Sequence, residues 1–234
     1  MAARDPSVPG LPEEVAAIRR EIAAFLNRTD TANRKIGSSK YGVYVFYDYD
    51  GEPIYAGQTE ESLRSRIGRH LTNQRTDAVA MNVLDPFEVA EIEVWPLDDL
   101  YASLPAADRV TFLNRAEFTV FQKALAESRL GAILNEKEVI ALPLIALPPS
   151  FRGRIIPESI YPRRKHPDVR AARRAATIAA LARVISERDV SDGLRRTLLT
   201  QARRLELLAS QRLVELGIPA SRKATDLPAP DGSH

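Results

Sequence analysis

Four side chains suited to phosphate chemistry occur close together in the sequence, at Tyr44, Tyr55, Arg66 and His70. Phenol and imidazole groups can orient or deprotonate a water molecule, and a guanidinium can stabilise the charge that develops on a phosphate. Each residue alone has a simpler explanation, because tyrosines pack well in strands and most helical Arg and His side chains lie at the surface. Their joint spacing is what favours chemistry on a phosphate.

The two tyrosines lie on a predicted β-hairpin. Residues 42–47 are β-branched or aromatic, which is typical of a strand, and a second strand is predicted over residues 53–57. Asp50-Gly51 between them favours a tight turn. Because side chains alternate faces along a strand, Tyr44 and Tyr55 are expected on the same side of the hairpin.

Arg66 and His70 lie on a helix that is predicted directly after the hairpin. Its apolar residues recur every four positions, at Leu63, Ile67 and Leu71. Arg66 and His70 are also four residues apart, so their side chains are expected one turn apart beside that apolar stripe. Thr59 is a candidate N-cap of this helix, and Ser62 is the alternative.

A longer helix, predicted to run from about residue 109 to Ser128, carries a carboxylate within its apolar pattern. The pattern consists of Val110, Leu113, Phe121 and Leu125. Glu117 falls four residues from two of these positions, and a buried carboxylate needs a partner. A divalent metal ion is one candidate partner. A structural pairing with Arg115, Arg66 or a tyrosine is the alternative.

These residues resemble the signature of the GIY-YIG nuclease superfamily. That signature has a Gly-x-Tyr strand, a Tyr-x-Gly strand about ten residues further on, and Arg-x-x-x-His on the next helix. It is matched here by Gly42-Val43-Tyr44, Tyr55-Ala56-Gly57, and Arg66 with His70. Val43 and Ala56 replace Ile at middle positions that tolerate small or branched apolar residues. The resemblance covers about residues 40–138.

The superfamily also carries a Glu on a later helix and an Asn beyond it. Glu117 and Asn135 are the candidates here. The resemblance implies that Asn135 orders the site by hydrogen bonding, and a helix-cap or turn role is the alternative.

The resemblance implies an endonuclease that hydrolyses phosphodiester bonds in double-stranded DNA with Mg²⁺, for which Mn²⁺ could substitute. Glu117 would hold the metal ion. The implied catalytic set is Tyr44, Tyr55, Arg66, His70, Glu117 and Asn135. The implied fold is α+β, with a small three-stranded antiparallel sheet flanked by helices and a C-terminal helical extension. The third strand is predicted over Phe87–Trp95.

The flanking segments favour one group within the superfamily. The chain has no Cys-rich zinc module, no long linker with helix-turn-helix pieces, and a modest length of 234 residues. It therefore looks most like the small type II restriction endonucleases that cut GC-only palindromes such as CCGCGG. This resemblance implies a homodimer and a cognate DNA methyltransferase. The alternatives are a less specific or structure-specific nuclease of repair or mobile elements, and a DNA-binding module that does not cut.

The composition is typical of a soluble globular chain, with 44% hydrophobic and 27% charged residues. Without Cys, disulfides, a thiolate nucleophile and Cys-ligated zinc are excluded. The longest apolar stretch, residues 139–147, is too short to span a membrane, and no export signal is evident. We expect a cytoplasmic protein that does not enter membranes.

The chain is expected to have four parts. Residues 1–40 form a helix (Glu13–Leu26) and a loop, and residues 41–140 form the catalytic core. Residues 141–219 form a Pro- and Arg-rich arm followed by two helices, and residues 220–234 form a disordered tail.

Charge is distributed unevenly between the body and the C-terminal part. Residues 1–150 hold 16 Lys and Arg against 22 Asp and Glu, whereas residues 151–234 hold 17 against 9. A basic extension favours binding to a polyanion, although a solvated helix surface is an equally good explanation. The expected DNA-binding residues are Arg34, Lys35, Arg152, Arg154, Arg163, Arg164 and Lys165.

Overall fold

A computed structural model of the chain describes residues 12–71, 85–135 and 139–219. Its centre is a four-stranded antiparallel sheet in the order β2-β1-β3-β4. The strands are β1 (Gly42–Tyr47), β2 (Pro53–Thr59), β3 (Glu91–Pro96) and β4 (Phe151–Arg154). The helices are α1 (Glu13–Leu26), α2 (Leu63–Leu71), α4 (Asp98–Ser103), α5 (Arg109–Glu127), α6 (Tyr161–Lys165), α7 (Pro167–Glu187) and α8 (Asp192–Glu215). Short 3₁₀ turns are η1 (Ile36–Ser38), η2 (Pro86–Glu88) and η3 (Ala106–Asp108).

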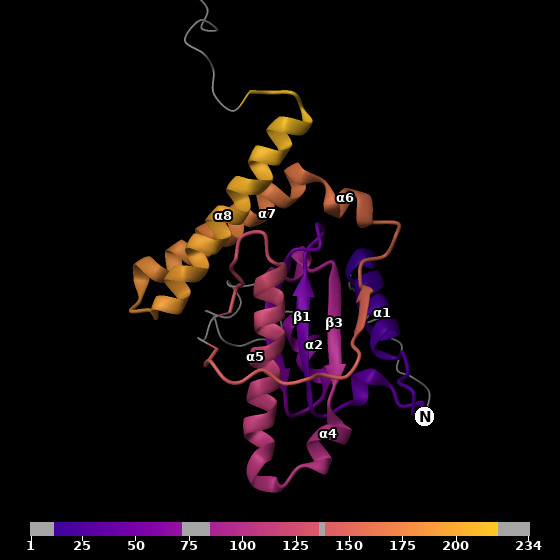
Figure 1. Ribbon diagram of the computed structural model, residues 1–234. Coiled ribbons are helices and arrows are strands. Elements are labelled where there is room, and N and C mark those ends of the chain that lie inside the picture. The colour runs from indigo at the N-terminus through magenta and orange to yellow at the C-terminus, as the bar shows by residue number, and fades with distance from the viewer. Residues whose placement is uncertain (1–11, 72–84, 136–138, 220–234) are drawn as a thin grey trace, which may run out of the picture.

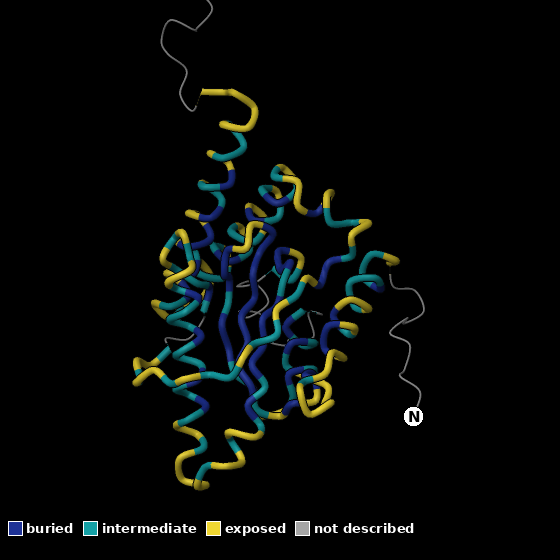
Figure 2. Tube along the Cα trace, turned by 45° about the vertical axis from the view of Figure 1, so that its right-hand side comes forward, coloured by how far each residue is buried: buried dark blue, intermediate teal, exposed yellow. Residues whose placement is uncertain are grey.

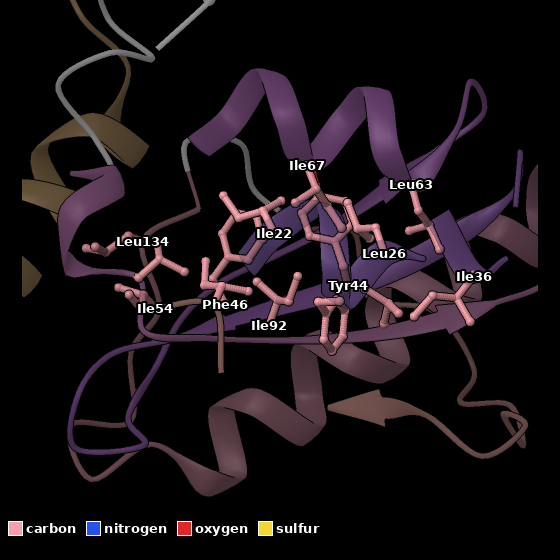
Figure 3. Close-up of a cluster of buried hydrophobic side chains, with 14 of the residues drawn as sticks. Ile22, Leu26, Ile36, Tyr44, Phe46, Ile54, Leu63, Ile67, Ile92 and Leu134 are labelled. Atoms are coloured by element: carbon pink, nitrogen blue, oxygen red, sulfur yellow. The ribbon is translucent and has the colours of Figure 1, made fainter. Parts of the chain in front are cut away.

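Helices cover both faces of the sheet (Figure 1). Helices α1 and α2 pack on the face that includes Tyr44 and Phe46, as the close-up in Figure 3 shows. Helix α5 packs on the opposite face, against Val43 and Val45. Strands β1, β2 and β3 are buried along most of their length between these layers, whereas β4 and the outer sides of the helices are more exposed (Figure 2).

The sequence predicted three strands, but the sheet has four. The additional strand, β4, comes from the predicted Pro- and Arg-rich arm and pairs with β3. The arm crosses over α5 and the front of the sheet before it reaches β4 (Figure 1). The third predicted strand is shorter than expected, because residues Pro86–Glu88 form a 3₁₀ turn instead. Helix α4 lies between β3 and α5 in the chain.

Several local predictions are confirmed. Helix α1 has the expected bounds. Gly51 in the hairpin turn has φ = +72°, a left-handed conformation that suits glycine. Ser62 rather than Thr59 caps α2, since the Ser65 backbone N–H donates to the Ser62 hydroxyl at 3.0 Å. Ser191 caps α8 in the same way, accepting from the backbone N–H of Leu194.

Helices α7 and α8 bind the turn of the β1–β2 hairpin through a buried cluster of charged side chains. A single oxygen of the Asp48 carboxylate, Oδ2, accepts from the guanidinium groups of Arg204 at 2.7 Å, Arg174 at 2.9 Å and Arg170 at 3.1 Å. The Glu88 carboxylate accepts from Arg174 and Arg170 as well. All five side chains are buried. Part of the positive charge of the extension therefore neutralises acidic groups of the body, and these arginines are not available to a polyanion.

Within the described parts of the chain, no helix is long and apolar enough to cross a membrane. The expected disordered tail, residues 220–234, lies outside the described residues, and the four-part division of the chain remains a prediction.

Candidate active site

Tyr44 is the centre of the candidate site. Its side chain is fully buried, and its phenol oxygen lies 3.0 Å from Nε2 of His70. The Nε–H of Arg66 donates to the same oxygen at 3.3 Å. The phenol therefore lies between an imidazole that can exchange a proton with it and a guanidinium that holds positive charge beside it. The structure thus brings three of the predicted site residues into direct contact.

Tyr55 joins this group through its ring. Its centroid lies 6.2 Å from that of Tyr44 and 5.1 Å from that of His70. Phe46 closes the cluster from the hairpin, with its ring 5.9 Å from the His70 ring. Two phenols and an imidazole therefore pack together beside the ring of Phe46. The prediction that both tyrosines lie on the same side of the hairpin is confirmed.

Gly57 is part of the site for a steric reason, although the predicted site set omitted it. It lies opposite Tyr44 in the β1–β2 register. A Cβ atom at this position would lie 2.8 Å from the phenol oxygen of Tyr44 and 2.9 Å from a ring carbon of Tyr55. Glycine is therefore required if the Tyr44 phenol is to lie across the strand. The strand register, together with the glycine of the Tyr-x-Gly motif, could have indicated this from the sequence.

We expect Gly57→Ala to slow DNA cleavage by about a hundredfold, because displacing a reacting group by about 1 Å has effects of this size. The loss of stability should be about 1 to 3 kcal/mol, as for overpacking. Cleavage rate and urea unfolding measure the two effects. Gly68→Ala on α2 is the matched control, since its Cβ would meet no atom of the described residues within 4 Å. Equal activity in both variants would contradict the steric role of Gly57.

Helix α5 runs antiparallel to β2, along the edge of the sheet. At one end of the pair, Nε2 of Gln58 donates to Oδ1 of Asn114 at 2.9 Å. At the other end, the Ser128 hydroxyl donates to the Glu52 carboxylate at 2.5 Å. Since a helix rises about 1.5 Å per residue and a strand about 3.4 Å, both segments span about 20 Å between these two contacts. The two hydrogen bonds therefore fix the position of α5 along the direction of β2.

This position of α5 along β2 brings Glu117 beside the cluster of Tyr44, Tyr55 and His70. Glu117 is three residues after Asn114, on nearly the same side of α5, and about 4.5 Å further along the helix axis. That distance corresponds to little more than one strand residue, so Glu117 lies level with Gly57 and its neighbour Ala56. Because β2 is an edge strand in the described sheet, groups from α2 and from α5 can meet around it. The Glu117 carboxylate accordingly contributes to the electrostatics of Tyr44.

The predicted apolar stripe of α5 is confirmed at Leu113 but is wrong at its other positions, and from Phe121 onward it is displaced by one residue. The residues that pack on the sheet are Leu113, Ala116, Val120 and Ala124. Val110, which the sequence placed in the stripe, is 57% exposed. Glu117 therefore lies half-buried at the flank of the stripe rather than within the core. This position leaves its carboxylate better able to take a ligand than a core position would.

The pKa of Tyr44 is raised well above the usual value for a phenol. Burial is the largest cause, and the nearby Tyr55 and Glu117 raise it further, while the positive charge and the hydrogen bond of Arg66 lower it. Tyr44 is therefore a neutral phenol at neutral pH. Neutralising the Glu117 carboxylate removes one of the causes that raise the pKa of Tyr44.

Asn135 makes two hydrogen bonds to the free edge of β2. Its Oδ1 accepts from the backbone N–H of Ala56 at 3.2 Å, and its Nδ2 donates to the carbonyl of Ala56 at 2.9 Å. The oxygen and the nitrogen of the Asn135 side-chain amide thus both bind the strand between Tyr55 and Gly57. Asn135 therefore holds the backbone of β2 next to Tyr55.

The predicted DNA-binding residues are found on several elements, and most of them pair with acidic groups of the chain. Arg34 pairs with Asp30 and Asp99, and Arg152 pairs with Glu91. Arg154 pairs with Glu158, and Arg163 and Arg164 both pair with Glu14. Arg164 is buried over the ring of Phe87, so its guanidinium does not face a DNA backbone in this structure. Lys35 and Lys165 are exposed.

The residues of the candidate site can be compared with the ligands that a divalent metal ion needs. Among the described residues, no cluster of three or more His, Cys, Asp or Glu side chains could enclose an ion. Mg²⁺ does not need such a cluster, because it usually keeps several water molecules and binds one or two carboxylates together with substrate phosphates. The half-buried carboxylate of Glu117, which lies near enough to Tyr44 to raise the pKa of its phenol, fits a hydrated ion of this kind.

Comparison with protein families matches residues 40–104 of the chain to the GIY-YIG catalytic domain. The matched region contains Tyr44, Tyr55, Arg66 and His70, whereas Glu117 and Asn135 lie beyond it. The match supports the GIY-YIG nuclease superfamily and indicates an endonuclease that acts on DNA. Nucleases of this superfamily generally use divalent metal ions. Neither the curated proteins nor the solved structures include a significant match to the chain.

Proposed function

We propose that the protein is a Mg²⁺-dependent, site-specific endonuclease that hydrolyses phosphodiester bonds in double-stranded DNA. The observation that carries this proposal is the buried phenol of Tyr44, held by His70 and Arg66 at the edge strand that Glu117 also approaches. A type II restriction enzyme acting in the cytoplasm on a palindromic site is the most specific form of the proposal. This form implies a homodimer and a cognate DNA methyltransferase.

The chain's own residues would divide the chemistry as follows. Tyr44 would orient the attacking water. Its phenol would pass its own proton to Nε2 of His70 through the 3.0 Å contact as it takes a proton from the water. The water oxygen would bond to phosphorus while the bond from phosphorus to the leaving oxygen breaks, and the leaving oxygen would then take a proton from solvent. Arg66 would stabilise the charge that develops on the phosphate. Glu117 would hold Mg²⁺, or Mn²⁺ in its place, which supplies charge stabilisation at the phosphate and at the leaving oxygen. Tyr55 packs beside Tyr44 and His70 and would help to orient the attacking water.

Digestion of plasmid DNA with the purified protein and Mg²⁺ tests the proposal. Discrete fragments with a common end sequence are expected from a restriction enzyme. Random nicking would instead indicate a less specific nuclease. Cleavage only at branched or damaged DNA would indicate a structure-specific nuclease. A mobility shift without cleavage would indicate a DNA-binding module. Sequencing the fragment ends would give the recognition site directly.

A further inference from the structure

The amide pair of Gln58 and Asn114 is a polar contact in the site region that the proposed chemistry does not use. Gln58 follows Gly57 on the edge strand β2, and its side chain turns to the α5 side of the sheet, where its cross-strand partner Val43 also packs. Its Nε2 donates to Oδ1 of Asn114 at 2.9 Å. The bond therefore joins the strand of the Tyr-x-Gly motif to the helix that carries Glu117.

Because Asn114 and Glu117 lie on the same helix, this bond influences the position of Glu117. The two residues are one turn apart on nearly the same side of α5, so a rigid helix transmits any shift of one to the other. The contacts of α5 with the sheet are made by an apolar stripe that includes Ala116 and Val120. Hydrogen bonds add directional contacts to this packing, and of the two that join α5 to β2 and its turn, the Gln58–Asn114 bond is the one nearer to Glu117.

The Gln58 side chain has a second feature that points toward the site. Its Oε1 is buried and has no hydrogen-bond partner among the described residues. Buried acceptors are normally satisfied, and an exception calls for an explanation. Carboxylates that hold metal ions are commonly oriented by hydrogen-bonding groups behind them, and bound water molecules need acceptors. The Gln58 side chain is bound to Asn114, one turn of α5 from Glu117. Its Oε1 can therefore act as a supporting acceptor of this kind.

We propose that Gln58 and Asn114 are positioning residues for a cation site at Glu117. The Gln58–Asn114 bond sets the level of the carboxylate along β2, and Oε1 of Gln58 accepts a hydrogen bond from the hydrated ion. This inference rests on the proposed function, because it takes Glu117 as the residue that holds the ion.

Direct measurement of Ca²⁺ binding by calorimetry, on the full chain with bound non-cleavable DNA, tests the inference. Asn114→Ala and Gln58→Met should each weaken Ca²⁺ binding about tenfold, within the range known for residues that support metal ligands. Both should also raise the Mg²⁺ concentration for half-maximal cleavage by a similar factor. Asn114→Asp retains an acceptor for Nε2 of Gln58 and should bind Ca²⁺ nearly as the parent does. Gln122→Ala, an amide about two turns further along α5, is the control and should change nothing.

Each outcome separates the inference from the proposed function. If Glu117→Gln loses Ca²⁺ binding while Asn114→Ala and Gln58→Met keep it, only the positioning role is overturned. If Glu117→Gln itself binds Ca²⁺ as the parent does, the cation site is wrong and the inference fails with it. A melting temperature measured for every variant guards against unfolding. Should Asn114→Ala not fold, Gln58→Met with the Asn114→Asp rescue still decides the question.

Discussion

Glu117→Gln is expected to lower the rate of DNA cleavage by at least about a thousandfold while leaving DNA binding intact. The substitution keeps the size of the side chain but removes the negative charge that would hold a divalent cation. Metal-assisted stabilisation of a phosphoryl transition state is worth several kcal/mol, and about 4 kcal/mol corresponds to this factor in rate. Cleavage of a plasmid under single-turnover conditions, with binding measured separately in Ca²⁺, gives both quantities.

The same variant distinguishes a catalytic carboxylate from a structural one. If Glu117 served only to pair with another side chain, its replacement would lower stability and leave the activity of the folded fraction unchanged. Arg115 is not the required partner, since its guanidinium donates to the carbonyls of Pro143 and Leu144. Retained cleavage in a stable Glu117→Gln protein would overturn the cation assignment. A further expected effect is a lower pKa of Tyr44, because the carboxylate charge that raises it is gone.

The hairpin and the helix after it could be predicted from the sequence because their signals are local. Strand alternation placed Tyr44 and Tyr55 together, and the spacing of Arg66 and His70 placed both on one side of α2. The motif spacing thus encodes most of the cluster around the Tyr44 phenol. The relation between Glu117 and this cluster depends on how α5 packs, which is a tertiary feature.

The error in the stripe of α5 has a physical cause. Apolar periodicity gives weight to large residues, and Phe121 and Leu125 dominated the prediction. The helix instead packs on the sheet through small side chains such as Ala116 and Ala124, which allow a close approach. Phe121 lies at the margin of that cluster. Small residues at a contact are a weaker signal in a sequence than large ones, although they decide which side of the helix is buried.

The fourth strand was missed because its sequence, Phe151-Arg152-Gly153-Arg154, does not look like a strand. Its exposure alternates, with both arginines outward. Gly153 has no side chain because a Cβ there would lie 2.9 Å from the Phe25 ring of α1. Pairing of Arg152 with Glu91 across the sheet stabilises the strand, which depends on a partner far away in the sequence. Tertiary contacts, rather than local propensity, define β4.

The charge asymmetry was read as a surface property, but part of it is internal. Arg170, Arg174 and Arg204 of the extension converge on Asp48 of the hairpin. Composition gives the charge of a segment without its partners, so the sequence could not show that a basic helix pair lies against an acidic turn. The two C-terminal helices therefore share a buried interface with the region of the GIY-YIG match.

Asp48→Asn is expected to lower the free energy of unfolding by about 3 to 5 kcal/mol at pH 7. The substitution keeps the shape of the side chain, but it leaves three buried guanidinium groups around a neutral amide, and breaking a buried ion pair costs this much. Native domains have only about 5 to 15 kcal/mol of stability, so a large part would be lost. Asp50→Asn is the matched control. Among the described residues the Asp50 carboxylate pairs with Arg170 alone, and the side chain is 28% exposed, so a loss of about 1 kcal/mol or less is expected.

The pH dependence of stability identifies Asp48 as the cause. Burial acts to raise the pKa of Asp48, but the charges of Arg204, Arg170 and Arg174 outweigh it and the pKa is lowered. A lowered carboxyl pKa gives stability that is complete above the unfolded value of about 3.9 and is lost as the pH falls through the folded value. The unfolding free energies of the parent and Asp48→Asn, measured in urea from pH 7 downward, should therefore converge below about pH 4. The pKa of Glu88 is raised by burial, so its protonation begins at higher pH and occurs in both proteins. Parallel curves throughout would show that the Asp48 charge does not hold the helices on the core.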